Sequence, residues 1–293
     1  MVGALIQARM GSTRLPGKVM TNIEGKPLLE HIVERLKRCK TIEKIIIATT
    51  TEKEDDTIEE FCKKKAIDFY RGSVDNVLER FINAAEKFGI TTILRVCADS
   101  PLIDPPSIDN MIKKLKNEGL DLVTINPEVT SLLDGVEVTT LDFLKTIRKK
   151  ASKQYHFEHV TYLAKEENIG KVCYYEPEDK IKTTDIRITV DTKEDLEFIR
   201  EVYKRLYKNG FVEIREIDTL PLYIFRINSK IKQKNPVLKS FIMNIVSKKI
   251  DDNLKDFIEV LSQSPSLKLN LVETKDKIKE EKGFISVSFE YLN

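Results

Sequence analysis

A basic, glycine-containing loop follows the first apolar run of the chain. It reads Arg9-Met10-Gly11-Ser12-Thr13-Arg14-Leu15-Pro16-Gly17-Lys18 and combines glycines, hydroxyl side chains and cations. Backbone N–H groups and cations in such a loop bind the oxygens of a polyphosphate. The loop does not match the Walker A spacing, because five residues separate Gly11 from Gly17-Lys18 and Val19 follows. It also lacks the G-x-G-x-x-G pattern of dinucleotide-binding turns. Spacing alone leaves a phosphate site and an ordinary basic surface loop equally open.

Two aspartates stand where buried strands are expected to end. Asp99 follows the apolar run Thr92–Cys97, and Asp191 follows Arg187–Val190. In an open α/β sheet, ligands bind beyond the carboxyl ends of the strands. A single aspartate at such a place is commonly a helix cap, so each is weak evidence by itself. Together with the basic loop, the pair predicts a metal–nucleotide site, because Mg²⁺ takes one or two carboxylates plus substrate phosphates.

An alternation of strands and helices is needed to position these residues. Apolar runs, most of them rich in β-branched residues, predict strands over Val2–Ala8, Lys44–Thr50, Ile67–Tyr70, Thr92–Cys97 and Asp121–Ile125. Amphipathic segments between them predict helices that begin near Pro27, after a cap at Asp75 or Ser73, and near Pro105 or Pro106. This alternation predicts an α/β fold with three layers, in which helices cover both faces of a mostly parallel sheet.

The later part of the chain repeats the alternation less regularly. We predict strands over Gly135–Thr140, Lys171–Tyr175 and Arg187–Val190, and helices over Leu141–Lys150, Gln154–Glu166 and Lys193–Lys208. After Tyr223 the pattern changes to Lys-rich helical segments and two alternating runs, Ser266–Val272 and Phe284–Tyr291. The sequence therefore predicts a domain over residues 1–223 and a small C-terminal α+β extension over residues 224–293, whose role it does not indicate.

The charge balance excludes several classes of partner. The chain has 49 Lys and Arg against 47 Asp and Glu, a net charge of +2, whereas a nucleic-acid-binding domain is clearly basic. No uncharged apolar stretch approaches the ~18–20 residues that span a bilayer, and the N-terminus does not resemble a signal peptide. The four scattered cysteines do not fit a zinc site or a disulfide framework. We expect a cytoplasmic protein with no nucleic-acid and no membrane partner.

The basic loop belongs to a longer motif. The segment Gln7–Val19 closely resembles the opening signature of the cytidylyltransferase family. That family includes the spore coat polysaccharide biosynthesis protein F group and, more distantly, the acylneuraminate and deoxy-octulosonate cytidylyltransferases. Further matches follow in the same order as in the family: Gly25–Leu28, Tyr70–Leu78, Ala98–Asp104 and Thr189–Leu196. The resemblance extends to about Leu222.

The resemblance implies a fold similar to the nucleotide-diphospho-sugar transferases and a Mg²⁺-dependent nucleotidyl transfer from a nucleoside triphosphate, CTP in this family. It implies that Arg9 and Lys18 hold the triphosphate, helped by Arg14 and by Gly11 and Ser12 of the loop. By the same resemblance, Asp99 and Asp191 are expected to bind Mg²⁺, and Gly72 and Ser73 to lie near the base. Catalysis is then expected from Arg9, Lys18 and Asp99. Relatives in this family are often homodimers.

The acceptor side of the site departs from the family pattern. Asp134 and Gly135 open a segment that resembles the Asp-Gly element of the family, but Thr139 stands where relatives have an acidic residue. His159 lies in a matching Glu-His-Val-Thr element, which Tyr162 follows in place of the usual proline. We predict that Asp134, Gly135 and His159 bind a sugar or sugar acid, although a histidine packed within a helix is the commoner explanation for His159.

Two other classes of protein remain as alternatives. A glycosyltransferase on a similar sheet would use a ready-made nucleotide-sugar, and its metal site usually contains Asp-x-Asp. No Asp-x-Asp occurs in the 293 residues, which disfavours this class. A non-catalytic relative is also disfavoured, because the basic loop and both strand-end aspartates are present.

Overall fold

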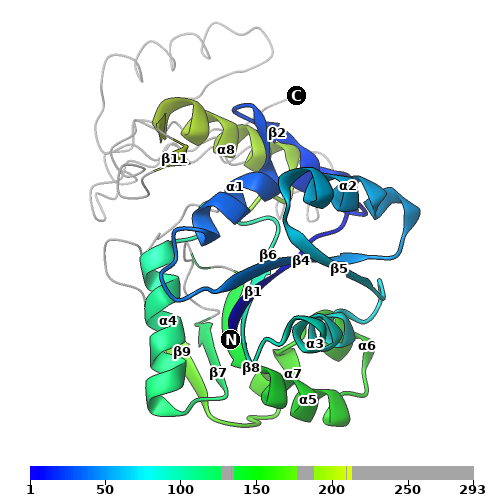
Figure 1. Ribbon diagram of the computed structural model, residues 1–293, viewed down its shortest axis with the longest axis vertical. Coiled ribbons are helices and arrows are strands. Elements are labelled where there is room, and N and C mark those ends of the chain that lie inside the picture. The colour runs from blue at the N-terminus through cyan, green and yellow to red at the C-terminus, as the bar shows by residue number, and fades with distance from the viewer. Residues whose placement is uncertain (127–132, 134, 177–187, 209, 213–293) are drawn as a thin grey trace, which may run out of the picture. The chain divides into compact units, whose positions relative to one another are not determined.

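A seven-stranded sheet forms the centre of the fold. The computed structural model describes residues 1–126, 133, 135–176, 188–208 and 210–212. The strands lie in the order β5-β4-β1-β6-β8-β7-β9 (Figure 1). They are β1 (Val2–Gln7), β4 (Lys44–Thr50), β5 (Asp68–Gly72), β6 (Thr92–Cys97), β7 (Leu122–Ile125), β8 (Val136–Thr140) and β9 (Val172–Tyr175). Strand β8 runs antiparallel to both of its neighbours, and the other pairs in this sheet are parallel. The prediction of a mostly parallel sheet is confirmed.

Helices cover both faces of this sheet. On one side lie α1 (Leu28–Leu36) and α2 (Asp56–Lys65); on the other lie α3 (Val77–Phe88), α5 (Leu141–Lys150), α6 (Gln154–Glu158) and α7 (Tyr162–Glu166) (Figure 1). The second interface is a buried cluster that includes Leu5, Ile46 and Ile93 from the strands and Phe81 and Leu144 from the helices. Because side chains alternate along a strand, the adjacent buried residues of β1 and β4 face the α1 and α2 layer. The predicted three-layer α/β fold is confirmed.

Most helix boundaries follow from residues that the sequence places at their ends. Helix α4 (Pro105–Glu118) begins after Asp104, whose carboxylate accepts the Ser107 N–H at 2.9 Å. Gly89 ends α3 with a φ of 68°, a left-handed conformation that suits glycine. The cap of α3 was predicted wrongly, since Asn76, not Asp75 or Ser73, accepts the Glu79 N–H. Ser73 Oγ instead accepts the Asn76 N–H and so forms the turn before the helix.

Three other predicted elements differ from the structure. Residues 188–190 form no strand; the Val190 N–H donates to the Asp99 carbonyl at 2.8 Å instead. The predicted helix Gln154–Glu166 is divided into α6 and α7, because Val160 has a φ of 48° and cannot continue a helix. Helix α8 (Lys193–Leu206) ends before Lys208, and the chain continues into a short hairpin of β10 (Tyr207–Lys208) and β11 (Phe211–Val212).

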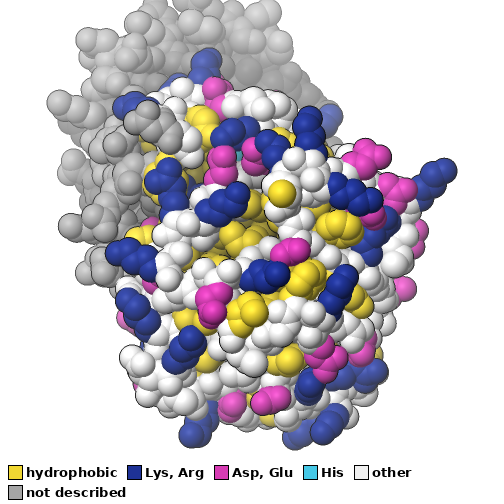
Figure 2. All heavy atoms as spheres, in the orientation of Figure 1, with side chains coloured by type: hydrophobic (Ala, Val, Ile, Leu, Met, Phe, Trp, Pro, Cys, Tyr) yellow, Lys and Arg dark blue, Asp and Glu magenta, His cyan; other side chains and the backbone are white. Residues whose placement is uncertain are grey.

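The predicted extension over residues 224–293 lies outside the described residues, as does the boundary at residue 223. Among the residues that the structure describes, none of the helices is both long and apolar enough to cross a membrane. On the face shown in Figure 2, Lys and Arg side chains are interspersed with Asp and Glu side chains. This distribution agrees with the nearly balanced charge of the sequence.

Candidate active site

The basic loop leaves the carboxyl end of β1 and is fixed by backbone hydrogen bonds. Met10 accepts N–H donors from both Ser12 and Gly17 through its carbonyl, and its own N–H donates to Asp55 Oδ1 at 2.6 Å. Gly17 has a φ of 71°, so glycine is required where the loop turns into the short helical turn η1 (Lys18–Met20). The loop therefore delivers Lys18 to a fixed position in the protein interior.

The Lys18 ammonium joins Asp99, at the end of β6, and Asp191, which precedes α8. Its Nζ lies 3.1 Å from Asp99 Oδ2 and 2.8 Å from Asp191 Oδ1, and it also donates to the Val190 carbonyl at 2.8 Å. Arg14 Nη2 lies 3.0 Å from Asp191 Oδ2. An ammonium has three donor hydrogens, so these three acceptors saturate Lys18. Four predicted site residues from distant parts of the chain thus meet in one charge-balanced cluster.

The same carboxylates suit a magnesium ion. Asp99 and Asp191 place oxygens within 3.1 Å of one point, the Lys18 nitrogen, and their side chains are 26% and 13% exposed. Mg²⁺ usually takes one or two carboxylates and completes its shell with water and substrate phosphates. Among the described residues no group of three or more His, Cys, Asp or Glu is arranged to hold a metal. The donor set is therefore compatible with a metal that completes its shell with substrate phosphates, and in this structure Lys18 engages both carboxylates.

The predicted base-binding residues lie at the end of β5, next to the start of α3. The Ser73 carbonyl accepts a hydrogen bond from Arg80 Nη1 at 3.0 Å. A Cβ at Gly72 would lie 3.0 Å from Arg80 Cγ and 3.0 Å from the Tyr70 ring, so the arginine stem packs directly on this glycine. A side chain at position 72 would therefore press on Arg80 and Tyr70, and Arg80 holds the backbone that follows β5.

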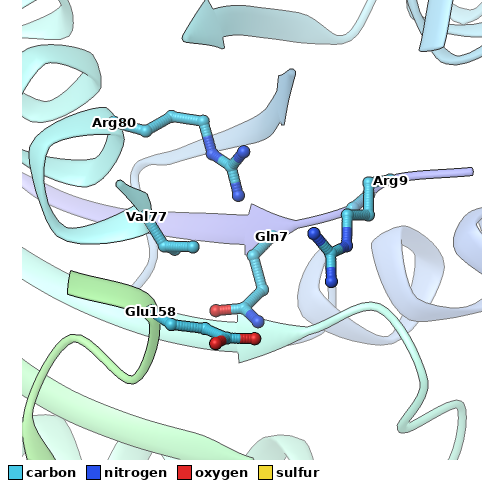
Figure 3. Close-up of a pocket in the computed structure, with 6 residues that line it drawn as sticks. Gln7, Arg9, Val77, Arg80 and Glu158 are labelled. Atoms are coloured by element: carbon cyan, nitrogen blue, oxygen red, sulfur yellow. The ribbon is translucent and has the colours of Figure 1, made fainter. Parts of the chain in front are cut away.

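A small pocket lies between these elements. Its walls are formed by Gln7, Ala8, Arg9, Val77, Arg80 and Glu158 (Figure 3). Arg9 is exposed, whereas Arg80 is only 3% exposed. The sequence motifs indicate Arg9 but not Arg80, which lies within a helix packed on the sheet. The signal was present, because an arginine three residues after Val77 lies on the predicted apolar face of the helix.

A buried ionic network contacts Gln7 of this pocket, and no sequence motif indicates it. Glu137 accepts hydrogen bonds from Arg95 Nη1 at 2.6 Å, Thr161 Oγ1 at 2.6 Å and Lys165 Nζ at 2.8 Å. Burial opposes ionisation of Glu137, but Arg95 and Lys165 outweigh it and lower its pKa to about 2. Arg95 in turn donates to Gln7 Oε1 at 3.1 and 3.2 Å.

The three predicted acceptor-binding residues are only partly placed. Gly135 lies against the carboxyl end of β6, where a Cβ would be 3.1 Å from Cys97 Cβ. His159 is exposed and directly follows the pocket residue Glu158. Asp134 lies outside the described residues. Gly135 is therefore close to the Asp99 turn, and the roles of all three residues stay predictions.

Gly135→Ala is expected to lower the free energy of unfolding by about 1–2 kcal/mol or more, because a left-handed backbone costs about that much with a side chain. Gly135 has a φ of 77°, and the new methyl group would also press on Cys97. Urea unfolding measures the loss. Gly25→Ala is the matched control, since Gly25 has a φ of 83° but no atoms within 4 Å of its Cβ position. Equal losses in the two variants would contradict the contact with Cys97.

Comparison with known proteins gives a consistent assignment. The cytidylyltransferase family model matches residues 3–239. The spore coat polysaccharide biosynthesis protein SpsF of Bacillus subtilis is 33% identical over 222 residues, which cover 74% of this chain and 92% of that protein. The uncharacterized protein MJ1063 of Methanocaldococcus jannaschii is 37% identical over 236 residues, covering 79% and 96%.

The fold gives the same result. A solved cytidylyltransferase from Leptospira borgpetersenii superposes with a TM-score of 0.68 at 32% identity, covering 74% of this chain and 92% of that one. The sheet is that of the nucleotide-diphospho-sugar transferase fold. With a family match over most of its length and relatives above 30% identity, the chain belongs to the cytidylyltransferase family.

Proposed function

We propose that the protein is a Mg²⁺-dependent enzyme that transfers CMP from CTP to a hydroxyl group of a sugar or sugar acid and releases pyrophosphate. The observation that carries the proposal is the meeting of Lys18 with Asp99 and Asp191 beyond the carboxyl ends of the strands. The spore coat polysaccharide biosynthesis relative supports a role in making a surface polysaccharide. A cytoplasmic location and a homodimer remain predictions.

In this reaction the acceptor oxygen forms a bond to the α-phosphorus and the bond from the α-phosphorus to the bridging oxygen breaks. Pyrophosphate leaves with that oxygen, and the hydroxyl proton passes to water. Arg9 and Lys18, aided by Arg14, would bind the triphosphate and offset its charge. Asp99 and Asp191 would hold Mg²⁺, which neutralises phosphate charge and lowers the pKa of the attacking hydroxyl when bound. Lys18 has three donors, all engaged before the nucleotide arrives. When Lys18 exchanges these partners for phosphate oxygens, it releases the Asp99 and Asp191 carboxylates. Nucleotide binding is thereby coupled to their release.

The glycosyltransferase alternative is less well supported. The family match covers the basic loop and both aspartates, and the chain contains no Asp-x-Asp element. The cytidine base follows from the family, whereas the acceptor does not, because Thr139 and Tyr162 depart from the family pattern at the acceptor segments.

Pyrophosphate release with each of the four ribonucleoside triphosphates tests the proposal, using a panel of sugar acids and sugar phosphates as acceptors. We expect turnover with CTP and Mg²⁺ and at least one acceptor, and little with ATP, GTP or UTP. Omission of the acceptor controls for triphosphate hydrolysis. Turnover of a nucleotide-sugar in place of CTP would favour the glycosyltransferase, and the absence of any CTP binding would refute the proposed function.

A further inference from the structure

Arg80 is a buried cation with an unused donor. Its side chain is 3% exposed, and it uses Nη1 to hold the Ser73 carbonyl. Its Nε has no hydrogen-bond partner within the described part of the chain. A buried donor left unpaired is costly and uncommon in folded proteins. Since Arg80 lines the pocket of Figure 3 and its guanidinium points into it, a ligand in that pocket would supply the missing acceptor.

The charge around Arg80 also lacks compensation. Burial and, to a smaller extent, the nearby Arg9 lower the pKa of Arg80 to about 10, against the opposing effect of Asp55. The guanidinium is still protonated at neutral pH. Neither Arg9 nor Arg80 forms an ion pair with a described residue. In particular, neither pairs with Glu158, which lines the same pocket. Two neighbouring guanidinium groups therefore favour an electron-rich oxygen between them.

A third donor completes the wall of the pocket. Gln7 Oε1 already accepts two hydrogen bonds from Arg95, so its amide NH₂ is the group that remains for a ligand. Figure 3 shows the Gln7 side chain between Arg9 and Glu158. Apart from the Glu158 carboxylate, the polar side chains of the pocket thus offer donors, which match acceptor oxygens.

We propose that Arg80 binds the nucleotide directly, with its Nε–H donating to an acceptor oxygen of the phosphates or of the base. The inference rests on the proposed function, which assigns triphosphate to Arg9 and the base to Gly72 and Ser73. Arg80 connects these assignments, because its stem packs on Gly72, its Nη1 holds Ser73 and its guanidinium shares a pocket with Arg9. That placement favours the nucleotide over the acceptor sugar as the partner of Nε.

Calorimetric titration of the full chain with CTP, CMP and cytidine tests the assignment. Arg80→Met keeps a stem that can pack on Gly72 and removes every donor. We expect it to raise the Kd for CTP about tenfold or more, the loss typical of one hydrogen bond to a charged group. Equal weakening of all three ligands would identify a base oxygen, and weakening of CTP and CMP without cytidine would identify a phosphate oxygen. Arg148→Met is the control, since Arg148 is a surface residue paired with Glu79.

The outcomes separate this inference from the function on which it rests. If the wild-type chain does not bind CTP, the proposed function fails. If the wild type binds CTP and folded Arg80→Met binds it equally well, the inference fails and the function stands. A change confined to the KM of the acceptor would also overturn it. Arg80→Lys, which keeps the charge but has no donor at the Nε position, replaces the Met variant if that variant does not fold, and wild-type affinity in it counts against the proposal in the same way.

Discussion

Asp99→Asn is expected to reduce kcat for pyrophosphate release by about 10²–10³-fold, the effect typical of removing one preorganised electrostatic contact in an active site. The substitution keeps the size of the side chain and one oxygen for Lys18, whose Nζ lies 3.1 Å from Asp99 Oδ2 in the wild type. It removes the negative charge that pairs with the Lys18 ammonium and that the proposed metal would require. The substitution should therefore lower kcat, which fixed-time assays of pyrophosphate release measure directly.

A matched aspartate distinguishes this effect from a general change of charge. Asp68 begins β5 at the opposite end of that strand from Gly72, and it pairs with Lys44 at 2.9 Å. Asp68→Asn should keep wild-type turnover. Thermal unfolding of Asp99→Asn should remain close to wild type, because Asp99 is partly exposed. Turnover within a few-fold of the wild type in the folded Asp99→Asn protein would exclude Asp99 from catalysis.

Local sequence was enough to predict the parts of the site that lie on strand ends. Gly11, Gly17 and Lys18 are close together in the chain, and the turn they form depends on backbone bonds within the loop. Asp99 and Asp191 were both predicted because each follows an apolar run, although the run before Asp191 is not a strand. Their approach to Lys18 joins residues 81 and 173 positions away. Asp99 follows strand β6 at the edge where ligands bind in α/β sheets, and the backbone hydrogen bond from Val190 to Asp99 brings Asp191 to the same place.

The remaining parts required knowledge of tertiary pairing. Glu137 and Arg95 are the single charged residues of their strands, and only the antiparallel register of β6 and β8 sets them opposite each other. Thr139, which stands where relatives have an acidic residue, donates its hydroxyl to the Asp121 carbonyl. Arg80 was missed for a related reason, because helical periodicity shows which face is buried but not that the face meets a ligand pocket there.

Glu137→Gln is expected to lower the free energy of unfolding by about 3–5 kcal/mol, the usual result of removing one partner from a buried ion pair. Arg95 and Lys165 would then lack their counter-ion, and burial makes such charges costly. Urea unfolding at pH 7 measures this loss. Glu79→Gln is the control, because Glu79 pairs with Arg148 on the surface, where an ion pair contributes about 1 kcal/mol at most.

The pH dependence gives a second, independent measurement. The pKa of Glu137 is lowered from 4.5 to about 2 in the folded chain, so the unfolded chain binds more protons between these values. Stability therefore rises with pH through that window and is lost as the pH falls from 4.5 toward 2. Glutamine does not titrate, so the difference between wild type and Glu137→Gln should be largest near neutral pH and should shrink steadily below pH 4.5. The difference in unfolding free energy between the two proteins could instead stay constant down to about pH 2.5, near the folded pKa. That result would mean that Glu137 contributes shape rather than charge. The Arg95–Gln7 contact would then be held by other means.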